Sequence, residues 1–368
     1  MKIRSAILIG MLTALLSVAV LLVSGQFGGT ATTAQTPQDQ GIVSYTPGAA
    51  QLAAAQKYWT PERMAAAKPL DLISVEGEPP EAGEAAALPQ GPPVVAPSGT
   101  GRGAVAEALE ATVDSISVGG AETLGYAYPF PFNRFQVFDA YKTFPYSTMG
   151  VLFFTQGGVN YRCSAATTNS PERRLIWTVG HCVAAGDGAT WSTNVLFVPQ
   201  YKNGNAPKGT WAGCQLFTMT SWFANGNLGE DMGAIKACDR PDGTRIGDVV
   251  GYLGFTCNAS RVQLWNLFGY PAAAPFNGKT LQTCQASHAV NDNNMNPATI
   301  GIGCDMTGGC SGGPWVQSFV RNKAGANNYL NGDNSYKYIN PAQPLALYGP
   351  YFGQNACDLR TFAINNGA

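Results

Sequence analysis

The stretch Gly308-Gly309-Cys310-Ser311-Gly312-Gly313-Pro314-Trp315 places one serine among glycines. A serine hydroxyl is a weak nucleophile at neutral pH and must be activated by a neighbouring base. Glycines beside it allow a tight backbone turn that points N–H groups at a developing negative charge. This pattern favours an acyl-transfer nucleophile at Ser311, and the alternative is a Gly-rich loop without a chemical role.

Two upstream stretches contain the other groups that an activated serine needs. Trp177-Thr178-Val179-Gly180-His181-Cys182 places a histidine directly after an apolar strand, and Gly229-Glu230-Asp231-Met232-Gly233-Ala234-Ile235 places an acid before a strand of small residues. An imidazole takes the serine proton and returns it to the leaving amine, and a carboxylate on the other ring nitrogen fixes its tautomer. Alone, His181 also suits a buried histidine and Asp231 a turn acid. Together with Ser311 they predict a base, an orienting carboxylate and a nucleophile.

His288 is the only other histidine in the sequence and therefore the only rival base. It occurs in Cys284-Gln285-Ala286-Ser287-His288, without the apolar strand and adjacent cysteine that frame His181. We expect a surface or loop histidine at this position, so the role of base stays with His181.

The N-terminus has the pattern of an export sequence. Lys2 and Arg4 precede an uncharged run over 5–25, and small residues follow, which predicts a signal peptide over 1–25. The run is also long enough for an uncleaved membrane anchor, which is the alternative.

Residues 26–117 then become rich in Ala, Pro, Glu and Gly, and residues 38–117 carry ten acidic side chains against four basic ones. With few aromatic residues to bury, 26–117 is predicted to be a flexible pro-segment or disordered linker, with short helices near 61–67 and 104–113.

All nine cysteines lie beyond residue 117. Cysteines behind an export sequence indicate an oxidising compartment and therefore disulfides. Metal binding is disfavoured because the chain has no Cys-x-x-Cys pair and only two histidines, so we expect no metal and no cofactor. Proximity favours the pairs Cys163 with Cys182, Cys214 with Cys238 and Cys284 with Cys304. Because the number of cysteines is odd, at least one thiol is free or paired between molecules.

Composition excludes two classes of protein. The formal net charge is -1 and 12% of residues are charged, against about 25% in an average soluble protein, so there is no basic surface for nucleic acid. A hydrophobic content of 45% argues against wholesale disorder.

Beyond residue 117 the apolar runs are short, rich in Val, Phe, Tyr and Trp, and separated by turn residues, which predicts an all-β closed or double-barrel architecture. The expected strands span 149–155, 175–179, 195–198, 215–219, 249–253, 264–270 and 315–320, and a helix is expected over 357–364.

The three chemistry-bearing stretches resemble the motifs of the chymotrypsin-like (trypsin-fold) serine peptidases, in that family's His, Asp, Ser order. Flanking segments at 145–150, 304–309 and 351–353 further resemble the bacterial and fungal branch related to glutamyl endopeptidases. The resemblance covers about residues 140–368. It implies two six-stranded antiparallel β-barrels and a short C-terminal helix in a peptidase domain over 118–368. It also implies that His181 is the base, Asp231 its orienting group and Ser311 the nucleophile, with the N–H groups of Gly309 and Ser311 forming the oxyanion hole.

The resemblance is incomplete next to the nucleophile. Digestive members have an acid before the serine, and this chain has Cys310 there. Cys310 could itself be the nucleophile, but the Gly-Gly-Pro spacing fits Ser311 better. We expect a disulfide from Cys310 to Cys304 or Cys357.

Substrate preference is the next question that the sequence addresses. Asp305 lies six positions before Ser311, where trypsin-like members place the acid that selects Arg or Lys; the alternative is that it faces away. Ser335 and Tyr336 resemble the strand that pairs with substrate backbone. No histidine follows Ser311, which disfavours strict glutamate preference.

These observations predict a secreted serine endopeptidase that is made as a precursor. Its partners are protein or peptide substrates, without nucleic acid, and it contacts a membrane only if the N-terminal run stays uncleaved. It is expected to be a monomer whose pro-segment is removed near residues 100–140 before activity. The alternative is a catalytically silent binding or cell-surface protein that retains the fold.

Overall fold

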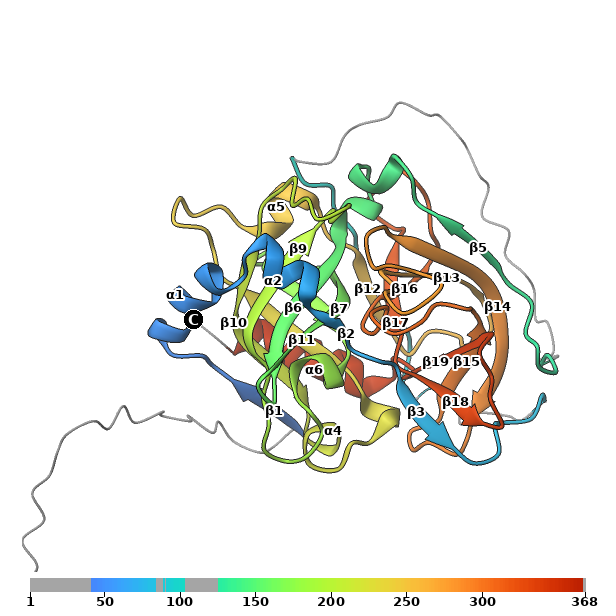
Figure 1. Ribbon diagram of the computed structural model, residues 1–368. Coiled ribbons are helices and arrows are strands. Elements are labelled where there is room, and N and C mark those ends of the chain that lie inside the picture. The colour runs from blue at the N-terminus through green and yellow to red at the C-terminus, as the bar shows by residue number, and fades with distance from the viewer. Residues whose placement is uncertain (1–40, 84–88, 90, 103–124, 367–368) are drawn as a thin grey trace, which may run out of the picture. The chain divides into compact units, whose positions relative to one another are not determined.

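A computed structural model describes residues 41–83, 89, 91–102 and 125–366 (Figure 1). The predicted signal peptide and the helix expected near 104–113 lie outside these residues. Within them, no helix is long and apolar enough to cross a membrane.

The first barrel is a closed antiparallel sheet. In the described part of the chain it consists of β6 (Met149–Gln156), β7 (Val159–Thr167), β8 (Leu175–Thr178), β9 (Thr193–Pro199), β10 (Trp211–Met219) and β11 (Gly233–Ala237). The strands follow the order β9-β6-β7-β8-β11-β10, and pairing of Trp211 with Phe197 returns β10 to β9. Phe and β-branched side chains suit these half-buried pleated strands, and Leu152, Phe154 and Ile176 are fully buried inside the barrel.

The second sheet is built around two tryptophans. From residue 254 onward it contains β12 (Gly254–Cys257), β13 (Leu264–Gly269), β14 (Gln282–Asp292), β15 (Thr299–Gly303), β16 (Pro314–Gln317), β17 (Tyr329–Asp333), β18 (Tyr336–Asn340) and β19 (Ala346–Gly349). Trp265 and Trp315 meet edge to face with ring centroids 5.6 Å apart. The chain ends in α6 (Gln354–Asn365), so the all-β fold with a short C-terminal helix is confirmed.

The prediction of a strand over 249–253 is wrong. The chain instead forms α5 (Ile246–Val250), which ends where Gly251 takes a φ of 82°. Ile246 and Val250 are four residues apart and both face the first barrel, which is helical spacing. An apolar run of five residues could not distinguish this helix from a strand. The other short helices are η1 (Ala140–Lys142), η2 (Tyr146–Thr148), α3 (Gly180–Val183), α4 (Thr220–Asn225) and η3 (Leu228–Glu230).

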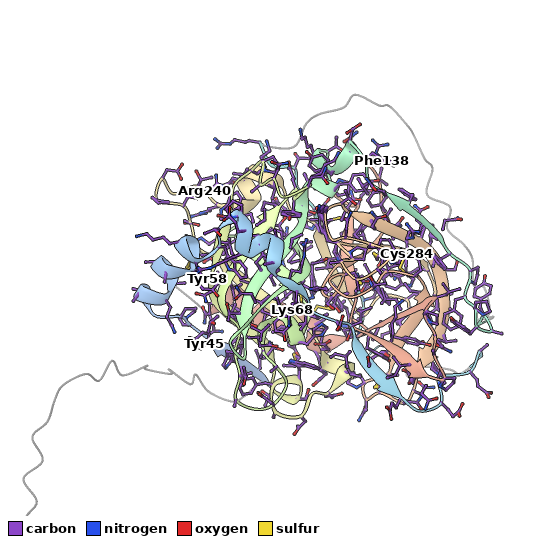
Figure 2. All side chains as sticks on the ribbon, viewed as in Figure 1. Tyr45, Tyr58, Lys68, Phe138, Arg240 and Cys284 are labelled. Atoms are coloured by element: carbon purple, nitrogen blue, oxygen red, sulfur yellow. A yellow bond between two sulfur atoms is a disulfide. The ribbon has the colours of Figure 1, made fainter. Side chains whose placement is uncertain are left out.

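Much of the segment expected to be flexible is folded, which corrects that part of the prediction. Its elements are β1 (Ile42–Tyr45), α1 (Ala49–Tyr58), α2 (Pro61–Ala66), β2 (Lys68–Pro69), β3 (Ile73–Glu76) and β4 (Val94–Ala96), coloured blue to cyan in Figure 1. Trp59 is buried and its indole N–H donates to the Asn194 carbonyl at 2.6 Å. Tyr58, labelled in Figure 2, donates its hydroxyl to Asn160 at 2.9 Å. A few large side chains hold the segment although its composition is poor in aromatic residues.

The N-terminal strands add to exposed edges of both sheets. β1 pairs with β10 in the first barrel, β3 with β18 and β4 with β12 in the second sheet, and β5 (Asn133–Gln136) with β14. Strand addition is stabilised by main-chain hydrogen bonds, which every residue type except proline can donate. This explains why composition did not reveal these strands.

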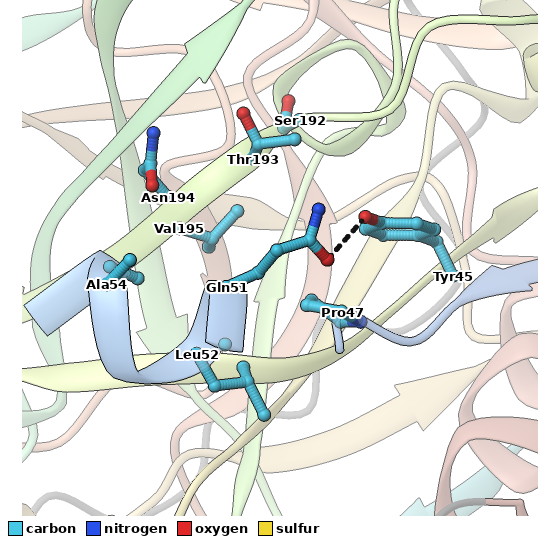
Figure 3. A pocket seen from close by; sticks show the side chains of 11 residues that line it. Tyr45, Pro47, Gln51, Leu52, Ala54, Ser192, Thr193, Asn194 and Val195 are labelled. Atoms are coloured by element: carbon cyan, nitrogen blue, oxygen red, sulfur yellow. Dashed lines mark hydrogen bonds between the residues drawn. The ribbon is translucent and has the colours of Figure 1, made fainter. Parts of the chain in front are cut away.

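Helix α1 covers a small recess on the first barrel. Figure 3 shows Gln51 of α1 and Tyr45 near Thr193 and Val195 of β9, and the Tyr45 hydroxyl donates a hydrogen bond to Gln51 at 3.1 Å. His181, Asp231 and Ser311 do not line this recess. It therefore belongs to the docking of the N-terminal segment and not to the predicted catalytic centre.

The described residues include all nine cysteines and form four disulfides. The bonds are Cys163–Cys182, Cys214–Cys238, Cys257–Cys357 and Cys284–Cys304. Cys310 is a buried free thiol. The disulfide expected for Cys310 is not formed, because Cys304 and Cys357 are both bonded to other cysteines.

Candidate active site

His181 and Asp231 meet in the first barrel. His181 lies in α3 directly after β8, and Asp231 lies between η3 and β11. The Asp231 side chain is fully buried; one carboxylate oxygen accepts the backbone N–H of His181 at 2.7 Å and the other lies 2.7 Å from His181 Nδ1. A carboxylate partner assigns the ring proton to Nδ1, so Nε2 is the free acceptor.

Ser311 lies in the tight turn that precedes β16. Gly309 and Gly312 have φ values of 92° and 75°, which glycine adopts without strain. A Cβ on Gly312 would lie 1.9 Å from the Thr178 hydroxyl, so the turn packs directly against the end of β8. Within the described residues, Ser311 Oγ and His181 Nε2 are buried and neither has a hydrogen-bond partner. Such atoms are rare in folded proteins, and these are the two atoms that proton transfer would join.

Ser164 and Asn334 hold the Ser311 turn in place. The backbone N–H of Ser164 donates to the Ser311 carbonyl at 2.7 Å, and its hydroxyl donates to the Gly309 carbonyl at 2.9 Å. The side-chain amide of Asn334 donates to the carbonyls of Phe268 and Cys310, both at 2.9 Å. Ser311 is therefore positioned from both sheets.

The side chain of Ser335 has a role that the sequence did not predict. Its hydroxyl donates to Asp231 at 2.6 Å, on the same oxygen that faces His181 Nδ1, so the side chain belongs to the His181–Asp231 unit. Tyr336 is fully buried and its hydroxyl donates to Asp292, so only its backbone lies on the edge of β18. The sequence indicated a strand here but contained no signal for the bond from Ser335 to Asp231.

A second buried carboxyl group lies near Asp231. Asp333 is fully buried and accepts a hydrogen bond from the Trp177 indole at 3.0 Å. Burial, together with the charge of Asp231, holds the pKa of Asp333 well above its usual range. Both effects favour the protonated form of the Asp333 carboxyl group.

Asp305 lies in an ion pair. Arg134 of β5 approaches it with 2.8 Å between Nε and a carboxylate oxygen, and both side chains are partly exposed. The acid expected to attract a basic substrate side chain is already paired with a basic group of its own chain. Arg134 is far away in sequence, so this pairing could not be predicted.

The rival groups do not suit catalysis. Burial raises the pKa of the Cys310 thiol to about 12, so the nucleophilic thiolate is absent at neutral pH. His288 is a buried residue of β14 and not the expected surface or loop histidine. Its Nε2 lies 3.1 Å from the Asn291 side chain, and burial lowers its pKa.

Two groups in the described residues bring three potential metal ligands together. They are Cys163, His181 and Cys182, and Cys284, Cys304 and Asp305. In each group the two cysteines are joined in a disulfide, and disulfide sulfurs are not the thiolates that metals bind. Neither group offers three free ligands.

Several solved structures of serine proteases are similar to this chain. The protease Anisep from Arthrobacter nicotinovorans is 38% identical, and the match covers 60% of this chain and 96% of that one with a TM-score of 0.55. The thermostable serine protease AL20 from an extremophilic microorganism is 32% identical over 60% of this chain and 98% of its own, also with a TM-score of 0.55. A Glu endopeptidase is 20% identical with a TM-score of 0.50, a likeness of fold alone. The chain therefore belongs to the chymotrypsin-like serine proteases.

Sequence comparisons add a partial match. An extracellular metalloprotease of Bacillus subtilis is 29% identical over 101 residues, which are 27% of this chain and 29% of that protein. The chain thus spans under a third of the length of this curated relative. No family model matches the sequence.

Proposed function

We propose that the protein is a serine endopeptidase in which His181, Asp231 and Ser311 form the catalytic triad. The observation that carries the proposal is the double contact of Asp231 with His181, through the backbone N–H and through Nδ1, each at 2.7 Å. Two bonds from one fully buried carboxylate fix both the position and the tautomer of the imidazole. The unpartnered His181 Nε2 and Ser311 Oγ support the same assignment.

In this mechanism Ser311 Oγ attacks the carbonyl carbon of the scissile peptide and its proton passes to His181 Nε2. The tetrahedral oxyanion accepts hydrogen bonds from the N–H groups of Gly309 and Ser311. His181 then donates its proton to the leaving amine, which departs and leaves an acyl-enzyme on Ser311. Water, deprotonated by His181, hydrolyses this ester and regenerates the serine.

Substrate backbone is proposed to bind along the edge of β18, at Ser335 and Tyr336. The Ser335 carbonyl accepts an N–H at 3.3 Å from an extended segment of the chain itself, which supports this edge as a peptide-binding site. Asp305 is proposed to lie near the substrate side chain, with its charge offset by Arg134.

Export and processing complete the proposal. Four disulfides are typical of proteins outside the reducing cytosol, which supports secretion after removal of 1–25. Residues 26–117 are proposed to be a pro-segment and 118–368 the peptidase domain of a secreted monomer.

A fluorophosphonate probe tests the proposal on the processed protein collected from culture medium. We expect one label per chain on Ser311, none on Ser311→Ala, and a loss of labelling rate of about 10⁴ in Asp231→Asn. The matched control is Ser221→Ala, because Ser221 is a partly buried serine whose hydroxyl donates to Glu230 and not to a residue of the proposed triad. Equal absence of label in the wild type and in Ser311→Ala would support a catalytically silent relative instead.

A further inference from the structure

The carbonyl of Leu70 bonds one of the two N–H groups proposed above as the oxyanion hole. It accepts the Gly309 N–H at 2.8 Å, and on the other side the Leu70 N–H donates to the Arg162 carbonyl at 2.9 Å. Three residues further on, the Ile73 N–H donates to the Ser335 carbonyl at 3.3 Å. Thus residues 70–73 bridge the two sheets and occupy main-chain groups on both sides of the Ser311 turn.

The flanking residues extend these contacts along both sheets. Lys68 and Pro69, in β2, pair in parallel with Tyr161 and Arg162 of β7; Lys68 is labelled in Figure 2. Strand β3 pairs in parallel with β18 from Ile73 opposite Tyr336 to Glu76 opposite Asn340. The edge of β18 that a substrate would use is therefore already paired along its length.

Side chains of residues 70–73 also pack against the proposed site. Leu72 is only 8% exposed and packs in the buried cluster that contains Met306 and Cys310, the residues beside Asp305 and Ser311. Asp71 lies so close to the Ser311 turn that a Cβ on Gly308 would be 2.5 Å from its carboxylate. An apolar side chain thus fills a recess next to the proposed nucleophile.

We infer that residues 68–76 are a tethered inhibitor, which keeps the peptidase latent by occupying the oxyanion hole, the β18 edge and an apolar recess. This inference rests on the proposed function. A substrate needs the Gly309 N–H to stabilise its oxyanion and β18 to align its backbone. Because one N–H and one strand edge cannot serve two peptides, substrate binding requires displacement of the segment.

The inference gives Leu72 a defined role. An uncharged aliphatic side chain gains stability by burial in this recess, whereas a carboxylate would be desolvated there without a partner. Leu72→Asp is thus expected to release the segment. Proline at positions 70 and 73 would remove the two backbone donors without changing the catalytic residues.

The test compares labelling rates of intact full-length chains. We expect slow fluorophosphonate labelling of the wild type and labelling at least about tenfold faster in Leu72→Asp and in Leu70→Pro/Ile73→Pro, abolished in each by Ser311→Ala. Ser74→Ala is the matched control, because Ser74 lies exposed in the same strand and is expected to label as slowly as the wild type.

A second measurement does not depend on the folding of these variants. A synthetic peptide of residues 67–77 is added to the processed protein, and its inhibition constant is compared with that of the same peptide carrying Leu72→Asp. We expect competitive inhibition that is at least about tenfold weaker for the Asp peptide. Equal potency of the two peptides would overturn the role of Leu72.

Two results separate failure of the inference from failure of the proposed function. If the intact wild type labels on Ser311 as fast as Leu72→Asp and the proline variant, the site is active but the segment does not inhibit it. If neither the intact variants nor the processed protein labels, the proposed function fails and the inference fails with it.

Discussion

Ser335 Oγ donates to the same Asp231 oxygen that faces His181 Nδ1, at 2.6 Å from the serine and 2.7 Å from the histidine. A single carboxylate oxygen thereby joins the proposed substrate-binding strand edge of the second sheet to the imidazole of the first barrel. The two halves of the site are aligned by one buried hydrogen bond as well as by the Ser164 contacts with the Ser311 turn.

This bond makes Ser335→Ala informative. A hydrogen bond to a charged group contributes about 1.5–3 kcal/mol, so we expect the free energy of unfolding to fall by about 2 kcal/mol. We also expect kcat of the processed enzyme to fall about tenfold with KM unchanged, because the substrate meets the Ser335 backbone and not its hydroxyl. Steady-state kinetics and urea denaturation measure both effects. A change in KM alone would assign Ser335 to substrate binding and not to positioning of Asp231.

The ion pair of Asp305 with Arg134 predicts that the processed enzyme does not prefer Arg or Lys at the cleaved residue. A positive substrate side chain would have to displace Arg134, whereas an aliphatic side chain could enter the recess that Leu72 fills. We expect a peptide library to show aliphatic preference. Arg134→Met should raise kcat/KM for basic substrates relative to aliphatic ones, and Lys142→Met serves as a control for the loss of one positive charge elsewhere. Preferential cleavage after Arg in the wild type would contradict this prediction.

The free thiol of Cys310 should be inert in the folded protein. Its pKa is raised to about 12 by burial, so thiolate is scarce at pH 8 and reagents have no access. We expect no alkylation by iodoacetamide in the native state, and one alkylated cysteine per chain after unfolding without reductant. Mass spectrometry counts the adducts. Rapid native alkylation coupled to loss of activity would revive Cys310 as a reacting group.

The sequence analysis was most informative where the proposed site depends on local motifs. Each residue of the proposed triad lies near glycines or at a strand end that the motif itself contains, so His181, Asp231 and Ser311 could be proposed together. The apolar runs likewise identified β6, β8, β9, β10, β13 and β16 but not the other strands from 149 onward. It failed where structure depends on distant partners: Arg134 beside Asp305, the buried position of His288 in β14, and the docking of residues 68–76. Strand addition uses backbone groups, so nothing in the composition of 26–117 distinguished a docked segment from a disordered one.

Docking along several strand edges also predicts that cleavage alone does not activate the enzyme. A cut between residues 102 and 125 would leave β1, β3 and β4 paired with β10, β18 and β12, and Trp59 buried. We insert a site for a sequence-specific protease after residue 110 and cut the folded chain. The N-terminal fragment should co-elute in gel filtration, and fluorophosphonate labelling should stay as slow as in the uncut chain until a second protease degrades the fragment. Prompt labelling on the first cut would indicate that the fragment is held by the covalent link and not by its pairing.

Lys337 of β18 provides a pH-dependent measure of packing beside the recess. Burial lowers its pKa from about 10.5 to about 8, and its ammonium donates to the Pro344 carbonyl at 2.6 Å. Between these two values the unfolded chain binds more protons than the folded one, so this lysine makes stability rise with pH across that window. Lys337→Met keeps the apolar stem but cannot titrate. The wild type should therefore gain free energy of unfolding relative to Lys337→Met between pH 8 and pH 10, as measured by urea denaturation, while below pH 7 the difference stays constant. Parallel stability curves over the whole range would mean that the ammonium is solvated and Lys337 is not desolvated by the fold.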